Sequence, residues 1–153
     1  MEVKMTTATQ ITQVPILLVE DDEFDVNSIR GAFSENQLTN PIAVAKDGID
    51  ALEKLRGTNG QTRLNPFPRV IMLDINMPRM NGIEFLRELR ADPLFHNLLV
   101  FMFASTDYEK DIISSYNLNI SGYIKKPLNF DNLTKTIFEL NSFWSQLQFP
   151  PEQ

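Results

Sequence analysis

The sequence predicts an α/β fold with a five-stranded parallel sheet and helices on both faces. Short continuous apolar segments, typical of strands buried on both faces, alternate five times with amphipathic segments of helical spacing. Such alternation is typical of parallel strands joined by right-handed crossovers. The length of 153 residues suits one such domain and leaves too little chain for a second ordinary one.

The first half of the chain contains three of the predicted strands, over 15–19, 42–45 and 70–73. Apolar residues at helical spacing predict two helices. One covers 23–36, and the other follows a cap formed by Asp47 and Gly48. Their apolar residues are Val26, Ile29 and Phe33 in the first helix, and Ile49, Leu52 and Leu55 in the second. Residues 57–68, rich in Gly, Asn and Pro, are an inserted loop before the third strand.

The second half repeats the alternation, with strands over 98–103 and around Tyr123 and Ile124. Helices are predicted over 82–91, 107–116 and 131–148, the second of them with an N-cap at Thr106 or Asp107. The last helix carries apolar residues on one side, namely Leu133, Ile137, Leu140, Trp144 and Leu147. We expect one domain over 14–148, an N-terminal tail at 1–13 and a C-terminal tail at 149–153.

Composition argues against several classes of protein. Apolar residues make up 42% and charged residues 22%, a mix that does not suit a disordered chain. The net charge of -6 gives no support for nucleic-acid binding. No Cys is present, which excludes disulfides and Cys-based metal sites. No apolar run approaches the roughly 20 residues of a membrane span, and the N-terminus does not read as a signal peptide. We therefore expect no membrane partner.

Charged residues follow three of the predicted strands. Glu20 and Asp21 follow the first strand, Asp74 the third and Lys126 the fifth. In an open parallel sheet, ligands bind beyond the carboxyl ends of the strands, where the strand order reverses. In the order 2-1-3-4-5 this point lies between strands one and three. The acids would then converge there, with the lysine reaching in from the fifth strand.

Converging acids predict a site for a hard cation. Neighbouring carboxylates raise each other's pKa unless a cation lies between them, and an all-oxygen site without His or Cys suits Mg²⁺. A carboxylate beside Mg²⁺ can attack phosphorus and form an acyl phosphate. The metal and a lysine would stabilise charge on the phosphoryl oxygens. Taken alone, the acidic segment could also be the solvated start of a helix, and we expect that role for Asp22.

Four motifs at the predicted strand ends resemble the signature of response-regulator receiver domains. They are VEDD at 19–22, LDINMP at 73–78, NG at 81–82 and YIKKP at 123–127. The resemblance covers about residues 14–148 and implies the flavodoxin-like, doubly wound fold with strand order 2-1-3-4-5. It also implies a cytoplasmic, stand-alone response regulator of two-component signal transduction. Such a protein accepts a phosphoryl group from a histidine kinase, acts through protein contacts or a phosphorelay, and turns over no small molecule.

The resemblance further implies roles for individual residues. Asp74 is the phosphoacceptor, and Lys126 contacts the phosphoryl group. The Lys126–Pro127 bond is cis, a form that is essentially restricted to proline. Tyr123 is either the aromatic that moves on phosphorylation or a plain strand residue. The implied Mg²⁺ ligands are Asp21, Asp74, the backbone carbonyl of Asn76 and, through water, Glu20.

One position departs from the family pattern. Receivers place a Thr or Ser at the end of the fourth strand, where its hydroxyl contacts the phosphoryl group and the aromatic of the fifth strand follows it. The spacing to Lys126 puts Ala104 at this position. Alanine has backbone groups that can contact the phosphoryl group but no side-chain hydroxyl. Tyr123 should then respond less to phosphorylation. Alternatively, the loop slips by one residue and Ser105 supplies the hydroxyl.

The insertion at 57–68 and the end of the chain at 141–150 are similar to those of the small receivers that partner cyanobacterial phytochromes. This implies a sensor histidine kinase of the phytochrome type as partner. Phe143 and Trp144 are adjacent and point to different sides of a helix, so we expect one of them to remain available to a partner. Together with Phe149 they predict a homodimer with two-fold symmetry. Alternatively, these aromatics only pack the helix onto the sheet.

Three other functions fit this pattern less well. A phosphohydrolase of the haloacid-dehalogenase type would need an acid two residues after Asp74, where Asn76 stands, and a cap domain. A flavodoxin-like cofactor carrier would need a phosphate-binding loop rich in Ser, Thr and Gly after the first strand, where acids stand. A degenerate receiver that only docks proteins ranks below a working receiver, because the acids needed for phosphorylation are all present, and Ala104 is the feature that keeps it open.

Overall fold

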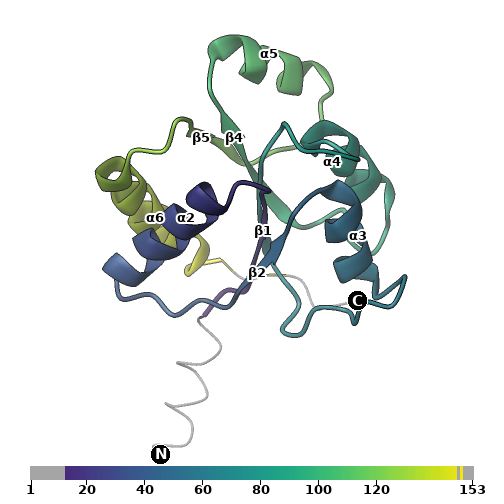
Figure 1. Cartoon of the computed structure of the whole chain (residues 1–153), viewed down its shortest axis with the longest axis horizontal. Coiled ribbons are helices and arrows are strands. Elements are labelled where there is room, and N and C mark those ends of the chain that lie inside the picture. The colour runs from purple at the N-terminus through teal and green to yellow at the C-terminus, as the bar shows by residue number, and fades with distance from the viewer. Residues whose placement is uncertain (1–12, 148, 150–153) are drawn as a thin grey trace, which may run out of the picture.

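The computed structural model describes residues 13–147 and 149, which form a parallel sheet of order β2-β1-β3-β4-β5, as predicted. The strands are β1 (Ile16–Val19), β2 (Ile42–Ala45), β3 (Val70–Leu73), β4 (Leu99–Ala104) and β5 (Gly122–Lys125). The helices are α2 (Glu23–Glu35), α3 (Gly48–Arg56), α4 (Gly82–Ala91), α5 (Asp107–Ser115) and α6 (Phe130–Trp144). Figure 1 shows α2 and α6 together on one face of the sheet, with α3 and α4 on the other.

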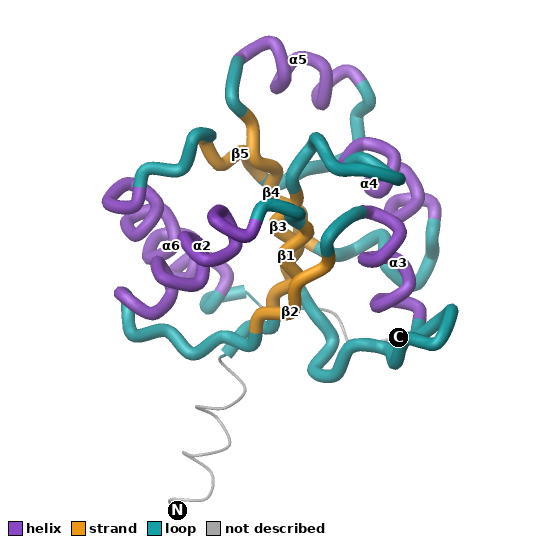
Figure 2. Tube along the Cα trace, viewed as in Figure 1, coloured by secondary structure: helices purple, strands orange, loops and turns teal. Residues whose placement is uncertain are grey.

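Each face of the sheet has its own apolar core. Alternate residues of each strand point to opposite faces, so in β1 Leu17 joins the core beneath α3, α4 and α5, and Leu18 joins the core beneath α2 and α6. Figure 2 shows the strands running between these two layers of helices. Burial on both faces explains why the strands read as continuous apolar segments.

The strand register brings the predicted site residues to one edge of the sheet. Val19 pairs with Leu73, so Glu20 and Asp74 follow neighbouring strands at the same level. Backbone hydrogen bonds extend this order beyond the strands: Glu20 N donates to Ala45 O at 2.9 Å, and Asp74 N donates to Val19 O at 3.0 Å. The sheet therefore fixes the backbone of both acids.

The last helix is shorter than predicted. It ends at Trp144, and Ser145 is its C-cap. The prediction extended the helix to Gln148, a residue that lies outside the described residues. The hydroxyl of Ser145 donates to the Asn141 carbonyl, and a side-chain bond of this kind competes with continuation of the helix. Leu147 is 38% exposed, so its expected place on the apolar side of the helix was wrong.

Trp144 is part of the core rather than of the surface. Its ring is fully buried, lies edge-on to Phe101 at a centroid distance of 6.0 Å, and donates from Nε1 to Asn141 Oδ1 at 2.9 Å. The expectation that Trp144 contacts a second copy is therefore corrected, because its surface is already used within the chain. Phe143 is 50% exposed, and the half-buried Phe149 packs against the core under α6.

The inserted loop at 57–68 is tied to the domain instead of standing away from it. Phe67 is buried and stacks on Phe95, and Gln61 Nε2 donates to Asp50 Oδ1 at 2.7 Å. Gly57 has φ 71, the left-handed conformation that commonly ends a helix at glycine. Among the described residues, none of the helices has both the length and the apolar character needed to cross a bilayer.

Candidate metal-binding site

Three carboxylates converge beyond the ends of β1 and β3. Glu20, Asp21 and Asp74 each offer an oxygen, and these atoms all lie within 4.8 Å of one another. Glu20 is 2% exposed and Asp74 is 8% exposed, whereas Asp21 is open to solvent. The buried acids thus form the floor of the site, and Asp21 lies at its mouth.

Lys126 occupies the middle of this group. Its Nζ lies 3.0 Å from Glu20 Oε2, 3.1 Å from Asp74 Oδ1 and 3.1 Å from Asp25 Oδ2. Its backbone N–H donates to Ala104 O at 3.0 Å, which holds the residue next to the end of β4. One ammonium is therefore shared by three carboxylates, with Asp21 nearby as a fourth acid.

Asp25 was not among the predicted site residues. It lies in the first turn of α2, where an acid is usual because it favours the positive end of the helix dipole. Asp22 is the N-cap of α2, and its Oδ1 accepts from Phe24 N at 2.8 Å, which agrees with the expected helix-start role of Asp22. The contact with Lys126 depends on the direction in which α2 leaves the sheet, and local sequence does not reveal that direction.

The electrostatics of the site favour a cation. Burial raises the pKa of Glu20 to about 7, the charge of Asp74 adds to this rise, and Lys126 only partly opposes it. Burial also raises the pKa of Asp74 despite its contact with Lys126. The pKa of Lys126 is raised, because its bond to Glu20 and the charges of the acids outweigh its own burial. All the donor atoms here are oxygens, and one lysine does not balance the negative charge of the acids. Such a site fits Mg²⁺.

The loop after Asp74, residues 75–81, is packed closely against the acceptor strand. A Cβ on Gly82 would lie 2.2 Å from the Asp74 carbonyl oxygen, so glycine is required at this position. Asn81 is the N-cap of α4 and forms a capping box with Glu84. Asn76 lies on this loop with an exposed side chain, and the role of its carbonyl as a ligand stays a prediction.

Beyond the acids, the structure shows the surroundings of the other predicted residues. The Lys126–Pro127 bond is cis. Strand β4 extends to Ala104, one residue beyond the predicted end, because Ala104 pairs with Lys125 of β5. Ser105 lies outside the ladder, is exposed, and donates its backbone N–H to Glu109 Oε1.

Tyr123 lies half-buried against α5. Its hydroxyl is 2.9 Å from the Ser114 hydroxyl and donates to the Lys110 carbonyl at 3.3 Å. The ammonium of Lys110 lies 5.6 Å from the centre of the tyrosine ring. The ring is therefore anchored to α5, and a movement toward β4 would break these contacts.

Comparisons with known proteins agree with this architecture. The family model of the response regulator receiver domain matches residues 16–138. The response regulator Rcp1 of Synechocystis sp. is 30% identical over 129 residues, which cover 84% of this chain and 87% of Rcp1.

Two solved structures support the same relationship. The phosphorylated cyanobacterial phytochrome response regulator RcpA has a TM-score of 0.78 at 28% identity, covering 92% of this chain and 99% of RcpA. The Mn²⁺-bound form of Rcp1 has a TM-score of 0.74 at 28% identity, covering 90% and 99% of the two chains.

Proposed function

The chain belongs to the family of response regulator receiver domains, and from this premise we propose that it accepts a phosphoryl group on Asp74 from a histidine kinase in a Mg²⁺-dependent reaction. The observation that carries this proposal is the shared lysine. Lys126 Nζ lies within 3.1 Å of a carboxylate oxygen of each of Glu20, Asp25 and Asp74, and the exposed Asp21 lies beside them. Family membership makes the phosphohydrolase and cofactor-carrier hypotheses unnecessary.

In the proposed site, some residues bind the metal and others bind the phosphoryl group. Asp21, Asp74 and the Asn76 carbonyl would hold Mg²⁺ directly, and Glu20 would hold it through water. Bound there, the cation supplies positive charge that stabilises the equatorial phosphoryl oxygens. The Mn²⁺-bound form of Rcp1 shows that a related protein binds a divalent metal.

The chemical step needs one nucleophile and one leaving group. A carboxylate oxygen of Asp74 forms the bond to phosphorus while the bond from phosphorus to the imidazole nitrogen of a phosphohistidine breaks. The imidazole then takes a proton from solvent, and the product is an acyl phosphate. The ammonium of Lys126 already lies 3.1 Å from Asp74 Oδ1, so a small movement brings it to a phosphoryl oxygen.

Metal dependence provides the test of this function. With acetyl phosphate as donor, we expect the parent protein to incorporate phosphoryl groups in Mg²⁺ and to stop when the metal is chelated. Asp21→Asn should need more Mg²⁺ for the same rate, because one direct ligand loses its charge. Asp22→Asn is the matched control, since its side chain caps α2 and Asn caps helices equally well. Incorporation that persists without a divalent metal would contradict the proposal.

The relationship to Rcp1 and RcpA supports a partner of the phytochrome-kinase type. We propose that the chain works as a receiver in the cytoplasm, with output by protein contact or phosphorelay and without turnover of small molecules. Phosphotransfer from a panel of histidine kinases would identify the donor. If no kinase of the phytochrome type transfers faster than unrelated kinases, this assignment of the partner fails.

We also propose a homodimer whose contact includes Phe143 and Phe149. The reason is the 50% exposure of Phe143 on the side of α6 that turns away from the core. In light scattering, Phe143→Ser should shift the protein toward monomer. Phe138→Ser is the control, because Phe138 is also exposed but points to another side of α6. A parent protein that stays monomeric at high concentration, with or without a phosphoryl mimic, would refute the dimer.

We further propose that Ala104 weakens the response of Tyr123 to phosphorylation. The pairing of Ala104 with Lys125 supports its position at the missing hydroxyl, and Ser105 is the stand-in if the loop slips. Ala104→Thr should enlarge the change in the Tyr123 ring environment on binding a phosphoryl mimic, measured by NMR. Ser105→Ala should remove whatever response the parent shows. A full response in the parent that Ser105→Ala leaves intact would refute both ideas.

A further inference from the structure

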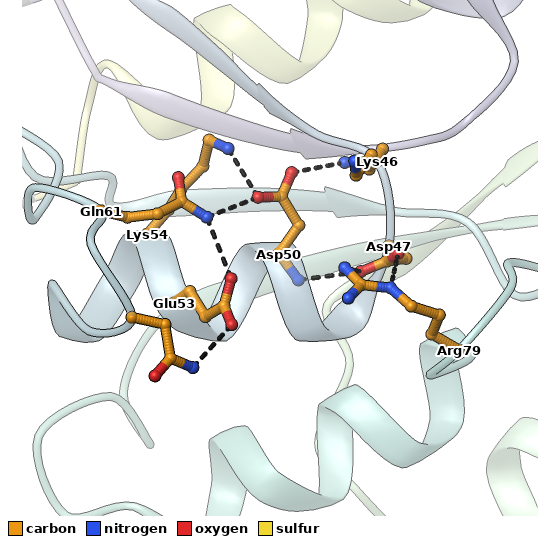
Figure 3. Close-up of polar contacts among 8 residues, drawn as sticks. Lys46, Asp47, Asp50, Glu53, Lys54, Gln61 and Arg79 are labelled. Carbon is orange, nitrogen blue, oxygen red and sulfur yellow. Dashed lines mark hydrogen bonds and ion pairs between the residues drawn. The ribbon is translucent and has the colours of Figure 1, made fainter.

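The loop that follows Asp74 is tied to the neighbouring β2–α3 turn by an arginine. Arg79 Nε donates to Asp47 Oδ2 at 2.8 Å, and its second nitrogen, Nη2, donates to Asp47 Oδ1 at 3.0 Å. This is a two-bond arrangement with geometric specificity that lysine cannot reproduce. Figure 3 shows the guanidinium facing Asp47 at the start of α3.

Asp47 is a fixed anchor for this arginine. It is 2% exposed, and its Oδ1 also accepts from Asp50 N at 2.8 Å, which makes it the N-cap of α3. Asp50 is held in turn by Lys46 N at 3.0 Å and by Lys54 Nζ at 2.7 Å. Although burial works to raise the pKa of Asp47, the bonds from Arg79 and the backbone hold it below its usual value, so the anchor stays ionised.

The backbone conformation of Arg79 is unfavourable, so the loop needs contacts such as the bonds to Asp47 to hold it. Its φ is 63, in the left-handed region that residues other than glycine, Asn and Asp seldom adopt. Gly48 N donates to the neighbouring Met80 carbonyl at 3.1 Å, so a second bond joins the same two loops. The side chain and the backbone together hold residues 75–81 in one shape.

We infer that Arg79 is a positioning residue, which through Asp47 holds the 75–81 loop so that the Asn76 carbonyl faces the metal site. The inference rests on the proposed function, since it concerns the same Mg²⁺ site. Outer groups that orient metal ligands typically change metal affinity by about 10- to 100-fold when removed. Arg79 itself need not touch the metal or the phosphoryl group.

A test must separate this role from a merely structural one. Arg79→Asn keeps a residue that tolerates positive φ but is too short to make the two bonds to Asp47. Arg79→Gly removes the side chain and relieves the backbone completely. Arg56→Ala is the matched control: it breaks another arginine–carboxylate contact between α3 and the end of α4, 3.4 Å to Asp92 Oδ2, far along the helices from residues 75–81.

The experiment is a calorimetric titration of the unphosphorylated protein with Mg²⁺. We expect about 10-fold weaker affinity in both Arg79→Asn and Arg79→Gly and parental affinity in Arg56→Ala. At saturating Mg²⁺, the rate of phosphorylation by acetyl phosphate should return to the parental value, a split that general damage to the fold would not give.

Parental Mg²⁺ affinity in both Arg79 variants would overturn the inference while leaving the proposed function intact. A fall in affinity that Arg56→Ala shares, or a rate that saturating Mg²⁺ does not restore, would also overturn it. A parent protein that binds no Mg²⁺ at all would overturn the proposed function together with the inference, so the two failures can be told apart.

Discussion

Lys126→Ala is expected to lower the free energy of unfolding of the metal-free protein by about 3 kcal/mol and to abolish efficient phosphoryl uptake. Removal of one partner from a buried ion pair leaves an uncompensated charge, which typically costs 3–5 kcal/mol. We expect the lower end of this range because the lysine side chain retains 17% exposure. Glu20, Asp25 and Asp74 would all lose their shared cation.

Urea unfolding in a chelator measures the first effect, and acetyl phosphate labelling in Mg²⁺ measures the second. Mg²⁺ should still bind to Lys126→Ala and restore part of the lost stability, because the acids remain and the metal replaces the missing charge. The adjacent and exposed Lys125 supplies the control, and Lys125→Ala should change stability by less than about 0.5 kcal/mol. Equal losses in the two variants would show that the ion-pair cluster does not hold the site together.

The metal-free protein is expected to lose about 2 kcal/mol of stability as the pH rises from 5 to 8. The pKa of Glu20 is raised from 4.5 to about 7 by burial and by the charge of Asp74. For a carboxyl whose pKa is higher in the folded protein, the stabilising contribution is fully present below 4.5 and is lost as the pH rises through 7. The direction is thus opposite to that of an acid held ionised by a salt bridge.

Denaturant unfolding at several pH values in a chelator measures this slope. Glu20→Gln should flatten it, because the neutral amide no longer titrates. Glu35→Gln, which removes an exposed carboxylate from the end of α2, should keep the parental slope. Saturating Mg²⁺ should also flatten the slope, because the metal favours the ionised acids. A Glu20→Gln variant with the parental slope would contradict the raised pKa.

The fold was predictable because burial on both faces leaves a plain pattern in the sequence. Each strand of a two-faced sheet must be apolar throughout, and its end is marked by the first charged residue, as at Glu20 and Asp74. The parallel topology then places those ends together without knowledge of any side-chain contact. For the same reason the main acids of the site could be named in advance.

The missed features depend on directions that local sequence does not encode. Asp25 reads as an ordinary first-turn acid, and its contact with Lys126 joins residues far apart in the chain. From the sequence, Arg79 is an ordinary turn residue. Its bonds to Asp47 depend on how the 75–81 loop packs against the β2–α3 turn. For Phe143 and Trp144, adjacency predicts different sides of the helix, but only the packing of α6 decides which ring enters the core.

Locating the phosphoryl group on the chain tests directly whether Asp74 is the phosphoacceptor. The parent protein and Asp74→Asn would be incubated with acetyl phosphate and Mg²⁺, reduced with borohydride to convert any aspartyl phosphate to homoserine, and mapped by peptide mass spectrometry. We expect homoserine at Asp74 in the parent and none at any position in Asp74→Asn. Modification of Asp21 or another residue in the parent, or persistent modification of Asp74→Asn, would contradict this assignment.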